Sequence, residues 1–180
     1  PVFTDVVTNL DYSPTGRLVL KEFANGIYST FTYDDSKLYR LTNITTITPS
    51  STKLQDISYT YDSVGNITSI TDISDTSTAK TVTYAYDDLY RLASAAALAP
   101  DGTELYTETY TYDSIGNITN KSDLGDYLYS HLAYANPHAV TTVGSLQLSY
   151  DSNGNLLSDP SRTYIWDWRN RISSINKGGT

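Results

Sequence analysis

The sequence predicts an all-β fold: an antiparallel ribbon of β-hairpin repeats, forming a curved or spiralling sheet with almost no helix. Three observations predict it. A short aromatic motif ending in Asp recurs six times in 180 residues. Within each copy the side chains alternate with a period of two, which is typical of a half-buried strand. Turn-forming residues follow each copy, and repetition at this spacing is the signature of a repeat architecture.

Each copy of the motif has an aromatic or apolar residue, one spacer, a Tyr or Trp, and then Asp. The first and third of these residues point to one face of a strand, and the spacer points to the other. The 17 tyrosines and the abundant Thr and Ser also favour strands. The six copies are Phe31-Thr-Tyr33-Asp34, Tyr59-Thr-Tyr61-Asp62, Tyr84-Ala-Tyr86-Asp87, Tyr110-Thr-Tyr112-Asp113, Leu148-Ser-Tyr150-Asp151 and Tyr164-Ile-Trp166-Asp167.

The Asp of each copy predicts a turn, because its side chain can accept hydrogen bonds from nearby backbone N–H groups. Glycine in several of these turns would supply a positive φ. An Arg or Asn follows, and the next residue is Leu or Ile, which begins the return strand. The predicted structural motif consists of Tyr33, Asp34, Tyr61, Asp62, Gly65, Asn66, Tyr86, Asp87, Arg91, Tyr112, Asp113, Gly116, Asn117, Tyr150, Asp151, Gly154, Asn155, Trp166, Asp167 and Arg171.

Two kinds of turn alternate along the chain. Tyr33 and Tyr86 lead into Leu-Tyr-Arg-Leu, whereas Tyr61 and Tyr112 lead into Gly-Asn-Ile-Thr. The segment from Leu89 to Leu98 is the one stretch rich enough in Ala and Leu to suggest a helix. Because it occupies the place of a return strand in the repeat, we interpret it as a strand.

The repeats predict one domain over residues 1–180, with about seven repeat units and about 14 strands. A degenerate first copy, Tyr12-Ser-Pro-Thr-Gly16-Arg17-Leu18, lacks the Asp. An insertion near 120–147 interrupts the spacing and contains both histidines, His131 and His138. The chain has no Met, even at position 1, which indicates a fragment of a longer protein.

Composition narrows the range of partners and chemistries. A net charge of −8 argues against nucleic acid and anionic membranes as partners. No apolar run is long enough for membrane insertion. The absence of Cys removes thiol nucleophiles and zinc–thiolate sites. No nucleophile–base pair or metal-ligand pattern is evident, so we expect no catalytic residues, cofactor or metal, and no enzyme activity.

The repeated residues resemble the YD repeats of Rhs proteins. Tyr84-Ala-Tyr86-Asp87-Asp88-Leu89-Tyr90-Arg91-Leu92 is a close match, as is Tyr110-Thr-Tyr112-Asp113-Ser114-Ile115-Gly116-Asn117-Ile118. The segment Asn136-Pro137-His138-Ala139-Val140 is similar to one near the end of many Rhs repeat regions. The resemblance covers nearly the whole chain.

The resemblance implies a β-ribbon that spirals into a hollow shell. In Rhs proteins and in components of Tc insecticidal toxins, such a shell encloses a toxic domain, and teneurins use a similar shell in cell adhesion. It therefore implies a structural part of an encapsulating shell in a secreted or cell-surface bacterial protein, with an enclosed toxin domain as a partner. The paired Asp-Pro-x-Gly motifs linked to self-cleavage in that family are not matched by Asp159-Pro160-Ser161-Arg162.

Alternatives from other classes remain open. Exposed Tyr rows beside Asp would suit a carbohydrate-binding or adhesion module with glycan partners. Open sheet edges invite pairing with the rest of a longer chain, or with further copies in an extracellular fibre. Arg17, Arg40, Arg91 and Arg171 are interpreted as pairing with turn carboxylates. The calcium-like spacing of Asp151, Asn153 and Asn155 is interpreted as a simple turn.

Overall fold

The computed structural model describes residues 6–130 and 136–178, and it confirms the all-β prediction. His131 lies outside the described residues. Besides the strands there is a short 3-10 helix, η1, at Asp35–Lys37. The strands are β1 Val7–Tyr12, β2 Leu18–Phe23, β3 Tyr28–Asp34, β4 Arg40–Ile47, β5 Lys53–Tyr61, β6 Ile67–Asp72, β7 Lys80–Tyr86, β8 Leu92–Leu98, β9 Glu104–Tyr112, β10 Ile118–Lys121, β11 Gly125–Leu128, β12 Thr142–Val143, β13 Leu146–Gln147, β14 Ser149–Tyr150, β15 Leu156–Asp159, β16 Arg162–Trp166 and β17 Ile172–Lys177.

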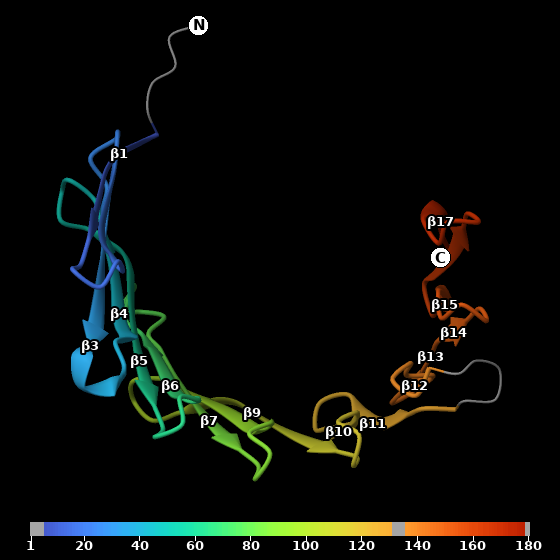
Figure 1. Ribbon diagram of the computed structural model, residues 1–180. Helices are drawn as coiled ribbons and strands as arrows, with labels where there is room; N and C mark the ends of the chain where they lie inside the picture. Colours follow the sequence, from blue (N-terminus) through green and yellow to red (C-terminus); the bar gives the residue numbers. More distant parts are fainter. Residues whose placement is uncertain (1–5, 131–135, 179–180) are drawn as a thin grey trace, which may run out of the picture. The chain divides into compact units, whose positions relative to one another are not determined.

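The strands pair antiparallel in chain order, so each hairpin is followed directly by the next (Figure 1). One sheet contains β1 to β13 and a second contains β14 to β17. The 17 strands exceed the predicted 14, because β12, β13 and β14 have only two residues each and leave no period-two pattern to detect. The Ala-rich segment forms β8, as predicted.

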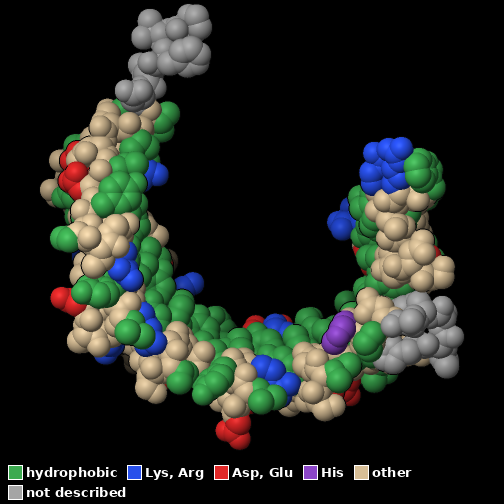
Figure 2. All heavy atoms as spheres, viewed as in Figure 1, with side chains coloured by type: hydrophobic (Ala, Val, Ile, Leu, Met, Phe, Trp, Pro, Cys, Tyr) green, Lys and Arg blue, Asp and Glu red, His purple; other side chains and the backbone are tan. Residues whose placement is uncertain are grey.

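The chain forms two compact units, Pro1–Thr107 and Glu108–Thr180. In the first unit, the period of two sorts side chains onto two different faces. We call one the apolar face, where Phe31, Ile44 and Ile57 stand opposite one another on successive strands. On the other, the hydroxyl face, Thr60 stands opposite Ser69 and their hydroxyl oxygens are 2.7 Å apart. Figure 2 shows hydrophobic side chains side by side along these strands.

Few side chains of the first unit are buried, because no second layer of its described residues covers the apolar face. Its buried apolar residues lie on β7 and β8 and just before them. They are Ala79, Val82, Ala95 and Ala97, of which Ala97 is fully buried. Tyr84 packs against the cluster that Val82, Ala95 and Ala97 form. Most other apolar side chains are half-buried, so contacts between neighbouring strands, rather than a thick core, stabilise the unit.

The second unit contains β10 to β13 and the four-stranded sheet. The stretch predicted as an insertion holds paired strands, because β11 pairs with both β10 and β12. Ala139 is buried within this unit. The described part of the chain contains no helix with the length and apolar character needed to cross a membrane.

Candidate functional site: the Tyr-Asp turns

The Asp that follows each Tyr holds the turn together through both of its carboxylate oxygens. In the turn after β5, Asp62 Oδ1 accepts hydrogen bonds from the N–H groups of Val64, Gly65 and Asn66, at 3.1, 2.7 and 2.8 Å. Asp62 Oδ2 accepts a bond from Asn66 Nδ2 at 2.8 Å. One carboxylate therefore satisfies four donors within five residues.

The same arrangement recurs in the later copies. Asp113 and Asp151 each accept a backbone bond and a side-chain bond from the Asn four positions on. Asp87 and Asp167 do the same with an Arg in that position. The Asn155 side-chain amide lowers the pKa of the Asp151 carboxyl, and the Arg171 guanidinium lowers the pKa of Asp167. The turns therefore favour the ionised carboxylates.

A positive φ is required one position before the Arg or Asn of each turn. Glycine occupies this place in three copies, with φ of 111° at Gly65, 92° at Gly116 and 84° at Gly154. Tyr takes it in the other kind of turn, with φ of 55° at Tyr39 and 60° at Tyr90. This left-handed conformation crowds the Cβ of an L-residue, so each Tyr carries a conformational cost that Gly avoids.

The hydroxyl of the motif Tyr binds the preceding repeat. Tyr33, Tyr61 and Tyr86 donate to the backbone carbonyls of Leu18, Leu41 and Ile67, at 2.9, 2.7 and 2.8 Å. Each acceptor is the apolar residue just after the Arg or Asn of the previous turn. Trp166 Nε1 makes the same bond to the Leu156 carbonyl at 2.8 Å. We call this series of bonds the tyrosine ladder. Tyr112 and Tyr150 end β9 and β14 at the matching positions.

One member of the ladder lies outside the six predicted copies of the motif. Tyr129 Oη donates to the Ile118 carbonyl at 2.9 Å, the bond that Tyr86 makes to Ile67. Ser130 follows Tyr129 in place of Asp, so the motif was not recognised. The aromatic pair Tyr127-Leu-Tyr129, with its period of two, is the signal that would have found it.

The prediction that four arginines pair with turn carboxylates is correct for Arg91 and Arg171, whose nitrogens lie 2.7 and 2.8 Å from Asp87 and Asp167. For Arg17 it is wrong, because Ser13 occupies the Asp position of that turn. The Arg17 guanidinium instead lies 4.8 Å from the centre of the Tyr39 ring.

Arg40 also differs from the prediction. Asp34 begins the two-residue longer turn that contains η1, where it accepts bonds from Ser36 and pairs with Lys37. Arg40 lies instead over the Tyr61 ring and donates to the Asp62 carbonyl at 3.0 Å.

Pro137 and His138 cover the turn at Asp113 by bonding to Asn117. Asn117 is buried, with 6% of its surface exposed. Its Nδ2 donates to Asp113 Oδ2 at 3.0 Å and to the Pro137 carbonyl at 2.8 Å. Its Oδ1 lies 2.7 Å from His138 Nδ1. Because an amide oxygen can only accept a hydrogen bond, His138 Nδ1 is the donor in this contact.

These features define a class of protein: a tandem β-hairpin repeat in which a Tyr-Asp turn binds each hairpin to its neighbour. The teneurin YD-shell family model matches residues 5–177, and the chain belongs to this family. The comparison bears out the resemblance to YD-repeat proteins.

Toxin subunits from Yersinia entomophaga are related in sequence. YenC1 is 33% identical over 213 residues, covering 94% of this chain and 22% of that protein. YenC2 is 34% identical over 146 residues, covering 63% and 15%. A Photorhabdus luminescens Tc holotoxin pore structure shares the fold, with a TM-score of 0.72 and 24% identity over 94% of this chain and 10% of that one. The chain thus spans about a fifth or less of these relatives.

Proposed function

We propose that this chain is a structural segment of a YD-repeat shell that encloses a toxin or effector domain in a secreted or cell-surface bacterial protein. The observation that carries the proposal is the tyrosine ladder, which joins each hairpin to the one before it. A sheet built this way can extend by adding hairpins without needing a second layer. Family membership and the relation to Yersinia toxin subunits support enclosure as the purpose of such a sheet.

The turn chemistry supports a role without catalysis. The Asp side chains accept bonds from the N–H groups and side chains of their own turns, and the motif Tyr hydroxyls of the ladder donate to backbone carbonyls. These polar groups are therefore committed to holding the sheet. A general base needs a free acceptor near a substrate proton, which these carboxylates do not offer.

In this proposal, the first partner binds at the unpaired edges of the sheet. An unpaired edge strand presents a row of free N–H and C=O groups, which pair readily with another strand. We propose that the edges of this segment pair with further strands of its own longer chain. The half-exposed apolar face would then be covered inside the complete shell, where the enclosed domain is the second partner.

Electron microscopy of the natural protein that contains this chain tests the proposal. We expect closed hollow particles with internal density, and we expect the enclosed domain to resist protease until the shell is opened. Continuous filaments whose repeat is one or a few chains would contradict enclosure and indicate a fibre. Open sheets that bind glycans on the apolar face would instead indicate an adhesion module.

A further inference from the structure

The Arg or Asn of one turn lies beside the aromatic ring of the next repeat. Arg17 lies over the rings of Tyr33 and Tyr39, at 6.0 and 4.8 Å from their centres. Arg40 lies over the Tyr61 ring at 5.7 Å. A guanidinium within about 6 Å of a ring centre is attracted by the electron-rich ring face. The first two repeats of this chain therefore supply their own cation to the rings that follow.

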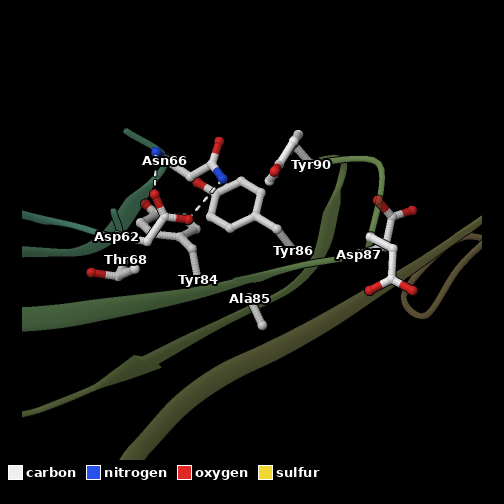
Figure 3. A pocket seen from close by; sticks show the side chains of 9 residues that line it. Asp62, Asn66, Thr68, Tyr84, Ala85, Tyr86, Asp87 and Tyr90 are labelled. Carbon is white, nitrogen blue, oxygen red and sulfur yellow. Dashed lines mark hydrogen bonds between the residues drawn. The ribbon is translucent and has the colours of Figure 1, made fainter. Parts of the chain in front are cut away.

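The next repeat keeps the rings but lacks the cation. Asn66 stands where Arg17 and Arg40 stand, and the following repeat presents Tyr84, Tyr86 and Tyr90. These residues line a surface pocket of about 400 Å³ (Figure 3). Neither Lys nor Arg is among its lining residues. The matching pocket one pair of repeats earlier has a similar volume, about 480 Å³, and Arg17 is part of its wall.

The charge around the Tyr90 pocket is negative. Asp62, Asp87 and Asp88 all line it. The Asp62 carboxylate is committed to its turn and Asp87 is paired with Arg91. Asp88 is exposed to solvent at the pocket. A cation entering this pocket would therefore meet aromatic faces together with an accessible carboxylate.

Tyr90 gives a second reason to regard the pocket as a binding site. Its side chain is 61% exposed, so its burial contributes little to the fold. Its φ of 60° belongs to the conformation for which three copies use Gly, and which Tyr39, the ring beside Arg17, also adopts. A strained residue that the packing does not require is typical of a functional site.

We infer that the pocket formed by Asn66, Tyr86, Tyr90 and Asp88 binds the arginine side chain of a polypeptide segment from outside these 180 residues. Arginine fits better than lysine, because its planar guanidinium stacks on aromatic rings and still offers N–H groups to a carboxylate. The chain itself provides the precedent, since Arg17 occupies the equivalent place beside Tyr39.

Titration of the 180-residue chain with short peptides, followed by NMR signals of the Tyr86 and Tyr90 rings, tests the inference. The probes are three otherwise identical peptides that contain arginine, lysine or citrulline, the last being a neutral analogue of arginine. We expect the arginine peptide to bind more tightly than the lysine peptide, and about fivefold or more tightly than the citrulline peptide. Equal binding of arginine and citrulline peptides, or no binding of either, would overturn the inference.

Two substitutions locate the site by introducing residues that equivalent turns of this chain carry at the same positions. Asn66→Arg places in this pocket the residue found at positions 17, 40 and 91, so it should compete with the peptide and weaken binding about fivefold or more. Tyr90→Gly restores the residue of the other turns and should abolish binding while the chain stays folded. Tyr39→Gly is the matched control, because Arg17 already lies over that ring, and it should leave peptide binding unchanged.

Photo-crosslinking from position 90 in the natural protein then identifies the segment that is bound. A crosslink to a peptide with arginine beside the linked residue supports the inference, whether the peptide belongs to the same long chain or to another protein. A crosslink to an arginine-free peptide or to a glycan overturns it. Because the peptide titration needs no shell, its outcome is independent of whether the protein encloses a toxin.

Discussion

Two turns of this chain have nearly the same sequence but different surroundings. Residues 59–68 and 110–119 differ only at Val64 and Ile115. Both turns use the Asp carboxylate in the same way, yet Asn66 borders an open pocket while Asn117 is buried beneath Pro137 and His138. The local sequence therefore determines the turn, and the next repeat determines whether the turn is exposed or covered.

The largest difference between the two turns is expected from removing the Asn side chain. Asn117→Ala removes a buried side chain together with its bonds to Asp113, Pro137 and His138, which should cost about 2 kcal/mol of unfolding free energy. Asn66→Ala removes one part-exposed bond to Asp62 and should cost about 1 kcal/mol or less. Urea denaturation of both variants measures the difference. Equal losses would show that the cover over Asn117 contributes nothing.

Replacing the turn glycine sharpens the comparison. Gly116→Ala puts a Cβ into open space, so the cost is the positive φ alone, about 1 kcal/mol. In Gly65→Ala the new Cβ would lie 2.8 Å from Arg40 Nη2, so the Arg40 side chain must also move away. We expect Gly65→Ala to be the more destabilising, by a few tenths of a kcal/mol for a weakened Arg40 interaction. Thermal denaturation of the pair tests this, and the reverse order would contradict it.

The bonds of the tyrosine ladder should stabilise the two turns by the same amount. Tyr86→Phe and Tyr129→Phe each remove one hydroxyl bond to a backbone carbonyl, to Ile67 and Ile118. Each should cost about 1 kcal/mol, because the ring stays in place and one carbonyl loses its donor. The measurement is the change in denaturation midpoint. A loss at Tyr86 with none at Tyr129 would mean that Tyr129 is not part of the ladder.

The two turns should differ least in how they lose stability as the pH falls. For both Asp62 and Asp113, desolvation raises the pKa, but the bonds from the Asn and from the turn N–H groups outweigh it, so the pKa lies below 3.8. A lowered pKa in the folded state means that this stabilisation is present above about pH 4 and is lost as the pH falls through the folded-state pKa. Hydrogen exchange at the Asn66 and Asn117 amides, which both donate to the Oδ1 of their turn Asp, should stay slow down to about pH 4 and quicken together below it. Quickening of one amide alone would contradict equal carboxylate roles.

The sequence was enough to predict the features that depend on residues close together in the chain. The strands follow from the period of two, and the turns follow from Asp and Gly at fixed spacing, so both could be located from the residues alone. The place of Arg17 could not be predicted, because it depends on which side chain the next strand brings alongside. The same holds for the cover of Asn117, since His138 lies 21 positions later.

Two further features did not follow from the Tyr-Asp motif. Tyr129 was hidden because its turn lacks Asp, although its bond to Ile118 is the same as that of Tyr86. The Tyr90 pocket was hidden for a different reason. The sequence places Tyr90 where other turns have Gly, but only the structure shows that its φ is positive and that its ring lines a pocket.

The tyrosine ladder also has a consequence for how such chains evolve. Each repeat brings one side-chain donor and one backbone acceptor, and it uses the acceptor of the repeat before it. A duplicated repeat therefore arrives with both halves of its connection already matched, so gene duplication can lengthen the protein without compensating mutations. Duplication of half a repeat would reverse the strand direction and break the series. Insertions and deletions in natural variants should therefore add or remove whole hairpins, and the number of hairpins is free to vary between lineages.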